Sequence, residues 1–144
     1  MGREKIKVYV FKTNELDLFK KAREIRDTVF VEEQNVPLEA EFDAFEGEST
    51  HYLLELEGKA IGTARWRIKD DSIKLERFGI YKSYRNQGLG EVLLKRILED
   101  IINLEKPIFL HSQLKAIPFY QRAGFTIVGE QFTECDIEHF RMEF

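Results

Sequence analysis

The hexapeptide Arg85-Asn86-Gln87-Gly88-Leu89-Gly90 is the most informative segment of this 144-residue chain. It lies between a strand-like run at residues 73–80 and a segment with helical spacing of apolar residues. Glycine lets the backbone approach a ligand and adopt positive φ at low cost, so successive N–H groups can point at one centre. The helix dipole adds positive potential there, and the guanidinium of Arg85 suits phosphate oxygens. The segment therefore predicts a cradle for a phosphate-bearing ligand.

Two common phosphate-binding motifs do not fit the hexapeptide. A Walker loop requires Lys followed by Ser or Thr after its last glycine, but Glu91 and Val92 follow Gly90. A dinucleotide-binding fingerprint requires a third small residue at the position of Leu93. The pattern that remains is Gln/Arg-x-x-Gly-x-Gly/Ala. The alternative without a ligand is a glycine-rich turn that caps a core helix.

A second segment, residues 116–125 (AIPFYQRAGF), has the features of a short helix that ends in Gly-Phe. Pro118 suits the first helical turn, and Gly124 suits the left-handed residue that ends a helix. In their order and spacing, the two segments resemble the two signatures of the GNAT superfamily of N-acetyltransferases. Four further stretches are similar to a bacterial subgroup, the ElaA/YjcF-like acetyltransferases: residues 29–37, 50–52, 62–65 and 110–113.

Composition and charge agree with a single domain over residues 1–144, which is long enough to bury one core. No apolar run is long enough to span a bilayer, and charged residues interrupt any signal pattern at the N-terminus. The one cysteine, Cys135, excludes an internal disulfide and suits a reducing cytoplasm. A net charge of −4 argues against nucleic acid as the main partner. We therefore expect a cytoplasmic protein that binds neither membrane nor nucleic acid.

The apolar periodicity predicts alternating strands and helices. Strands are expected at residues 7–12, 50–56, 60–68, 73–80, 108–111, 125–129 and 136–144. Helices are expected from Leu16 to about Phe30 with Thr13 or Asn14 as the cap, after the cradle, and around Pro118. An irregular acidic stretch is expected from Glu32 to Ser49. The expected fold is mixed α/β in the order β-α-(α)-β-β-β-α-β-α-β-β, and the resemblance implies a splayed central sheet flanked by helices.

The resemblance implies acetyl-CoA as cosubstrate and no metal. It places the pantetheine arm between the strand that ends at Ile80 and the strand at His111, with the diphosphate in the cradle. Many superfamily members have Asn at the position of Gln113, and a Gln can make the same hydrogen bonds. The residues expected to bind acetyl-CoA are Phe78, Gly79, Ile80, Arg85, Asn86, Gln87, Gly88, Leu89, Gly90 and Gln113.

Tyr120 occupies the position at which many relatives place the general acid that protonates the departing sulfur, and its structural alternative is a packed aromatic. An amine must lose a proton before it attacks a thioester. Glu76, His111 and His51 are the candidate bases, and relatives often use ordered water instead. Because alternate residues of a strand share a face, we expect Glu76 to point the same way as Phe78 and Ile80.

The segment from Thr28 to Gly58 contains no Lys or Arg and nine acidic residues. In the superfamily this region forms one wall of the acceptor pocket, so carboxylates such as Glu32 and Glu33 would attract a cationic amine. The alternative is an acidic surface that balances basic residues elsewhere.

Two classes of function follow. The first is an acetyl-CoA-dependent N-acetyltransferase, in which a primary amine of a small molecule or peptide attacks the thioester directly. The second is a non-catalytic acyl-CoA-binding or sensor module of the same fold. A homodimer is compatible with either class.

Overall fold

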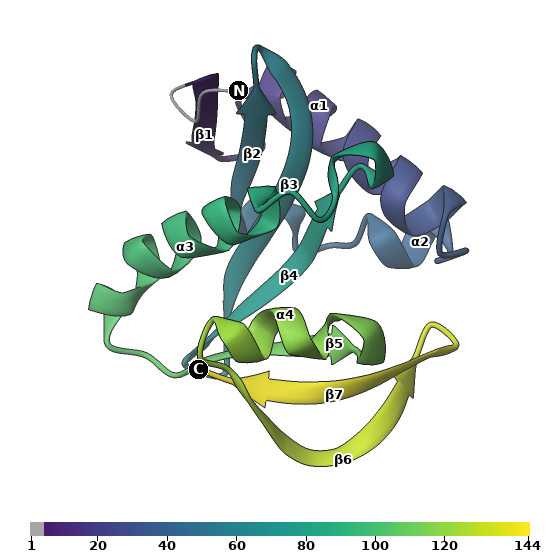
Figure 1. The fold of residues 1–144 in the computed structure, drawn as a ribbon, viewed down its shortest axis with the longest axis vertical. Helices are drawn as coiled ribbons and strands as arrows, with labels where there is room; N and C mark the ends of the chain where they lie inside the picture. Colours follow the sequence, from purple (N-terminus) through teal and green to yellow (C-terminus); the bar gives the residue numbers. More distant parts are fainter. Residues whose placement is uncertain (1–4) are drawn as a thin grey trace.

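The computed structural model describes residues 5–144 (Figure 1). Its elements in chain order are β1 (Ile6–Phe11), α1 (Leu16–Arg26), the π-helical segment η2 (Asp27–Glu32), α2 (Leu38–Glu41), η3 (Glu46–Glu48), β2 (Thr50–Leu56), β3 (Lys59–Lys69), β4 (Ser72–Ile80), η4 (Lys82–Tyr84), α3 (Leu89–Ile101), η5 (Ile102–Leu104), β5 (Ile108–Gln113), η6 (Leu114–Ala116), α4 (Ile117–Arg122), β6 (Thr126–Glu134) and β7 (Ile137–Glu143). This order confirms the mixed α/β fold.

The seven strands form one sheet in the order β1-β2-β3-β4-β5-β7-β6. All neighbours are antiparallel except β4 and β5, which run parallel. Their pairing ends at Leu75 and Leu110, so the last residues of β4 and of β5 do not pair with each other. The sheet is therefore splayed at its centre, as expected.

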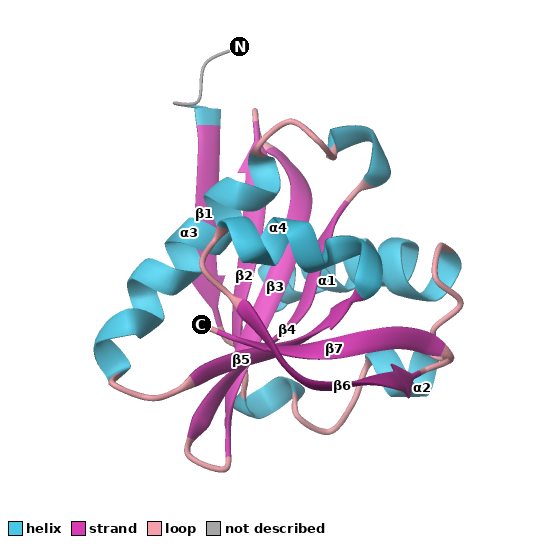
Figure 2. Ribbon diagram, turned by 60° about the horizontal axis from the view of Figure 1, so that its bottom comes forward, coloured by secondary structure: helices cyan, strands magenta, loops and turns pink. Residues whose placement is uncertain are grey.

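Helices cover both faces of the sheet (Figures 1 and 2). On one face, Leu93 and Ile97 of α3 and Tyr120 of α4 belong to a core cluster with Tyr52 and Ile73 of the sheet. On the other face, Ala22 and Ile25 of α1 pack with Phe11 and Leu53. No helix in residues 5–144 combines the length and the apolar character needed to cross a membrane.

The first helix differs from the expectation at both ends. Its N-cap residue is Glu15, and no side chain caps it, because residues 12–15 form a turn in which the Glu15 N–H donates to the Lys12 carbonyl. Thr13 and Asn14 lie within this turn and cap nothing. At the other end, α1 continues as η2, and π-helical turns are frequent near functional sites.

Two further segments differ from the prediction in where their secondary structure begins or ends. The acidic stretch, expected to be irregular, contains the short helices α2 and η3. The strand predicted at residues 125–129 extends to Glu134, and its pairing with β7 is interrupted between Val128 and Phe132. The extension includes Phe132 and Glu134, whose side chains contact His111 of β5 although β7 lies between the two strands in the sheet.

Candidate active site

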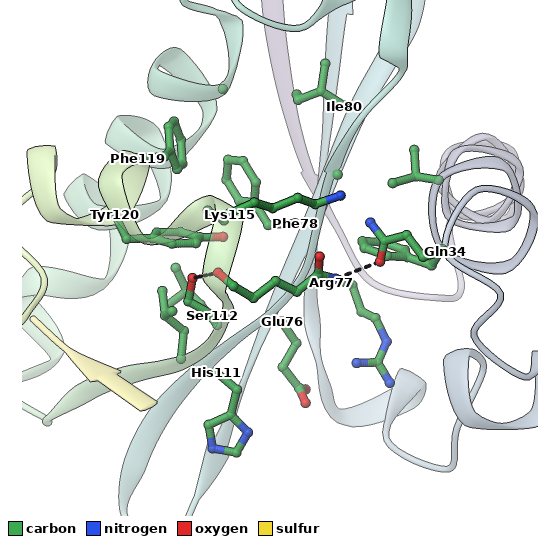
Figure 3. A pocket seen from close by; sticks show the side chains of 18 of the residues that line it. Gln34, Glu76, Arg77, Phe78, Ile80, His111, Ser112, Lys115, Phe119 and Tyr120 are labelled. Carbon is green, nitrogen blue, oxygen red and sulfur yellow. Dashed lines mark hydrogen bonds between the residues drawn. The ribbon is translucent and has the colours of Figure 1, made fainter. Parts of the chain in front are cut away.

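A cavity of about 700 Å³ lies where β4 and β5 separate (Figure 3). Residues of η2, α2, β4, β5, α4, the N-terminal turn of α3 and the β6–β7 hairpin line it. The volume is typical of a site for a small ligand. Of the predicted acetyl-CoA residues, those on its wall are Phe78, Gly79, Ile80, Arg85, Asn86, Gly88, Gly90 and Gln113. Gln87 instead bonds the Ser83 carbonyl, and Leu89 is buried in the core.

The cradle has the backbone geometry that its sequence predicts. Asn86 and Gly88 have φ of 62° and 80°, and Gly88 is the N-cap residue of α3. Within residues 5–144, the amide groups of Gly88, Leu89, Gly90 and Glu91 donate to no protein acceptor. Four free N–H groups at the positive end of a helix are suited to bind an anion. Gly90 also has a packing role, since a Cβ there would lie 3.3 Å from the Phe119 ring.

Arg85 lies beside the cradle with its guanidinium engaged. Its Nε donates to the Ile80 carbonyl at 2.8 Å, and its two terminal nitrogens lie 3.1 and 2.9 Å from the carboxylate of Glu33. Glu33 does not line the cavity, and neither does Glu32. Glu33 therefore contacts Arg85, the residue expected to bind phosphate, and does not contact the part of the cavity expected to bind the acceptor.

The expectation that Glu76 shares a face with Phe78 and Ile80 is wrong. Arg77 has φ of 56°, and the β3–β4 register shifts there, so β4 carries one extra residue at this point. A bulge of this kind reverses the alternation of side chains. Phe78 accordingly packs against Phe119 and Tyr120, with ring centroids 5.6 and 6.1 Å away. Glu76 points to the opposite face of the sheet, towards Arg65, and it still lines the cavity.

Glu76 is held in a cluster of cations. Its carboxylate lies 2.8 Å from Arg67 Nε, 3.0 Å from Arg65 Nη2 and 3.2 Å from Lys74 Nζ. Burial alone would raise its pKa, but the hydrogen bond from Arg67 and the charges of Arg65 and Lys74 lower the pKa to about 2. A carboxylate that holds its proton so weakly is a poor base at neutral pH, so this geometry favours an ion-pairing role.

Tyr120 points its hydroxyl into the cavity (Figure 3). Its ring is 9% exposed and is surrounded by Phe78, Phe119 and Phe125 at centroid distances of 5.1 to 6.1 Å. Burial raises its pKa well above the ordinary 10.0. The phenol is thus protonated at neutral pH and can donate a proton to a group in the cavity.

The two candidate histidines occupy different places. His111 lines the cavity, and its Nδ1 lies 3.1 Å from the carboxylate of Glu134. His51 lies beneath α1, 1% exposed, stacked on Phe11 and bonded to the Glu46 carbonyl. Burial lowers the pKa of His51. It does not line the cavity, which matches its alternative reading as a satisfied sheet residue.

The acidic segment supplies partners for buried arginines. Arg26, 1% exposed, lies 2.9 Å from Glu41 and 2.7 Å from Glu46. Arg65, also 1% exposed, lies 2.8 Å from Asp43. These contacts favour the reading in which the acidic residues balance basic residues elsewhere, and they weaken the charge argument for a cationic acceptor.

The cavity also contains residues that sequence reasoning did not single out. They include Gln34, Arg77, Ser112, Lys115, Phe119, Glu134 and His139. Ser112 and Phe119 adjoin predicted residues, so proximity in the chain could have indicated them. Glu134 and His139 come from the C-terminal hairpin, and no local pattern marks them.

A family model described as the acetyltransferase (GNAT) domain matches residues 16–144, and the chain belongs to this family. The protein named uncharacterized N-acetyltransferase YjcF of Bacillus subtilis is 38% identical over 120 residues, covering 82% of this chain and 86% of that one. Protein ElaA of Escherichia coli is 30% identical over 125 residues, covering 83% and 82% of the two chains.

Solved structures show the same fold. The crystal structure of Escherichia coli ElaA superposes with a TM-score of 0.84 at 24% identity, covering 95% of this chain and 98% of that one. A GNAT family acetyltransferase from Elizabethkingia anophelis, solved with acetyl-CoA bound, has a TM-score of 0.70 at 16% identity, with 98% and 96% covered.

Proposed function

We propose that this protein is an acetyl-CoA-dependent N-acetyltransferase that transfers the acetyl group to a primary amine by direct attack. The observation that carries the proposal is that one cavity is lined both by Gly88, Gly90 and Glu91, which bear free amides of the cradle, and by Tyr120 with its buried hydroxyl. An anion site next to a proton donor suits a cosubstrate that has phosphates at one end and a thioester at the other.

The residues present fit acetyl-CoA. The amides of Gly88 to Glu91 would bind the diphosphate. The backbone of Phe78 and Ile80, which has no β5 partner, would bond the pantetheine arm, although the Ile80 carbonyl already accepts a hydrogen bond from Arg85. Gln113, at the end of β5, would add a side-chain hydrogen bond. Acetyl-CoA supplies an activated acyl group with a thiol leaving group. A backbone N–H of β4 directed at the thioester oxygen would stabilise its developing charge, an effect typically worth about 10²–10³ in rate.

Tyr120 is assigned as the general acid. Its proton goes to the departing sulfur, and its burial keeps it protonated until that step. Since a thiol with an ordinary pKa of about 8.5 is already a fair leaving group, we expect Tyr120→Phe to lower kcat by about tenfold to a few hundredfold. Glu76, with its carboxylate bound to three cations, is not assigned as the base.

The proposal specifies the amine of the acceptor and leaves the rest of the acceptor open. The carboxylates of Glu41, Asp43 and Glu46 are bound to arginines, so they offer little attraction to a cationic substrate. A small-molecule amine and a peptide amine both remain within the proposal. The cytoplasmic location and the homodimer stay predictions from the sequence.

Thiol release from acetyl-CoA on addition of a panel of primary amines tests the proposal. An enzyme releases one equivalent of thiol per acetylated amine, and the product is identified by mass spectrometry. A non-catalytic acyl-CoA-binding module would bind acetyl-CoA in calorimetry and release no thiol with any amine. In an enzyme, Tyr120→Phe should retain binding of acetyl-CoA and lower turnover about tenfold to a few hundredfold.

A further inference from the structure

His111 and Glu134 form a pair on the side of the cavity opposite α1 and η2. His111 follows Leu110, the last β5 residue that pairs with β4, and Glu134 is the last residue of β6. The His111 Nδ1 lies 3.1 Å from Oε2 of Glu134, and both residues line the cavity. Figure 3 shows the His111 ring below Tyr120 in the view, on the β5 side of the gap.

The chemistry of the pair fixes which nitrogen of His111 carries the proton. The hydrogen bond from His111 holds the pKa of Glu134 below its ordinary value, so Glu134 is a carboxylate at neutral pH. A carboxylate has acceptors only, and therefore Nδ1 must donate. The lone pair of the neutral imidazole then lies on Nε2, and within residues 5–144 no protein group bonds that atom.

Aromatic rings hold the imidazole in place. Phe132 meets the His111 ring edge to face with centroids 4.9 Å apart, and Phe109 lies 5.9 Å away. Phe132 also stacks on His139 at 5.8 Å, which ties the hairpin to the pair. The ring orientation is thus set by the hydrophobic contacts and by Glu134 together.

Other charged groups near the pair already have partners. From β4, Lys74 lies 3.2 Å from Glu76. From β7, Arg141 lies opposite His111 in the register and pairs with Glu143 at 3.1 Å, and His139 bonds the Ile137 carbonyl. Glu134 is the carboxylate that bonds His111.

Building on the proposed function, we propose that His111 is the general base for the acceptor amine and that Glu134 is its positioning residue. An N–H bond of the acceptor ammonium breaks, its electron pair stays on nitrogen, and the proton bonds to Nε2 of His111. The imidazolium is stabilised by the Glu134 carboxylate and later releases the proton to solvent. The C-terminal hairpin thereby contributes to the chemistry.

The variant Glu134→Gln tests the positioning role of Glu134, and the variant His111→Gln tests the role of His111 as the base. Glu134→Gln keeps the size of the side chain and removes the charge that stabilises the imidazolium. We expect kcat/KM at pH 7 to fall several-fold and its acid limb to move to lower pH by about half a unit to one unit. His111→Gln should lower kcat/KM by about 10²-fold or more and abolish that limb. Glu130→Gln, an exposed change on the same strand as Glu134, is the matched control and should leave kcat/KM and its acid limb unchanged.

A second readout needs no acetyl-CoA. Nitrogen NMR of the free protein should show the Nδ1–H tautomer of His111 in the wild type and in Glu130→Gln, and a mixture of tautomers in Glu134→Gln. An Nε2–H tautomer in the wild type, or an acid limb that Glu134→Gln does not move, would overturn the roles proposed for His111 and Glu134. Either result would leave the acetyltransferase proposal intact. A wild-type protein that acetylates no amine would overturn both.

Discussion

Gln113 donates a hydrogen bond of 2.7 Å from its Nε2 to Oε1 of Gln34, which links the end of β5 to the turn after η2, and both residues line the cavity. The two residues are 79 positions apart in the chain. The bond uses one N–H of the Gln113 amide and leaves its other N–H and its carbonyl oxygen for a ligand. Gln34 thus orients the amide that is proposed to contact the pantetheine arm.

Gln113→Ala should weaken binding of CoA by about two- to tenfold, because one hydrogen bond to the ligand is worth about 0.5–1.5 kcal/mol. Gln34→Ala keeps the Gln113 amide and removes only its orienting partner, so its effect should be smaller. Calorimetry with CoA measures both variants. Wild-type affinity in Gln113→Ala would remove this residue from the binding site.

Gly88→Ala should affect both stability and binding. Gly88 has φ of 80°, and a left-handed conformation costs a residue with a Cβ roughly 1–2 kcal/mol. Relief of that strain would turn the cradle amides away from their common centre, so the affinity for CoA should fall as well. Thermal unfolding and calorimetry measure the two effects.

The control for Gly88→Ala is Gly47→Ala. At Gly47 the backbone does not have positive φ, and nothing lies within 4 Å of the added Cβ. We expect the control to match the wild type in CoA affinity and to be no less stable. Equal loss of stability in Gly88→Ala and Gly47→Ala would contradict the claim that the positive φ of Gly88 is what makes its substitution costly.

Local features of the sequence predicted the cradle, because its geometry depends on neighbouring residues. Gly88 terminates a loop and precedes an amphipathic helix, and both signals lie within a few positions of each other. The splay between β4 and β5 came from the family resemblance, since no local pattern shows where two parallel strands stop pairing. The strand boundaries were mostly correct because apolar alternation is itself local.

The parts of the site that the sequence did not predict depend on distant contacts. The bulge at Arg77 reverses the face of Glu76, yet arginine gives no hint of positive φ, and the bulge is defined by pairing with β3. Glu33 and Arg85 are 52 positions apart, and Glu134 and His111 are 23 apart. Such pairs become visible only when the chain is folded.

Glu33→Gln should strengthen acetyl-CoA binding. The Glu33 carboxylate lies 2.9 Å from the Arg85 guanidinium, so it competes with a phosphate for the same donors and repels that phosphate. We expect the KM for acetyl-CoA to fall about two- to fivefold at low ionic strength, and the gain to shrink as salt is added. Arg85→Gln should have the opposite effect. A higher KM in Glu33→Gln would show that Glu33 helps Arg85 to hold the ligand.

The cation cluster around Glu76 predicts a dependence of stability on pH. The pKa of Glu76 is lowered to about 2 in the folded protein, against an ordinary value of 4.5. A carboxyl group with a lowered folded pKa contributes stability at pH values above 4.5 and loses it as the pH falls towards about 2. Asp43, whose pKa is also about 2 because its bonds to Arg65 outweigh burial, acts in the same direction.

Glu76→Gln should therefore destabilise the protein at pH 7 by about 3–5 kcal/mol, since it leaves the buried cations of Arg67 and Lys74 without their counter-charge, whereas Arg65 keeps Asp43. Between pH 4.5 and pH 2 its free energy of unfolding should decline less steeply than that of the wild type, and Asp43 accounts for part of the remaining slope. Urea unfolding across this range measures both effects. Asp71→Asn, at an exposed pair with Lys106, is the control and should change little. If folded Glu76→Gln were to lose about 10²-fold or more in kcat, Glu76 would have to be restored as a candidate base.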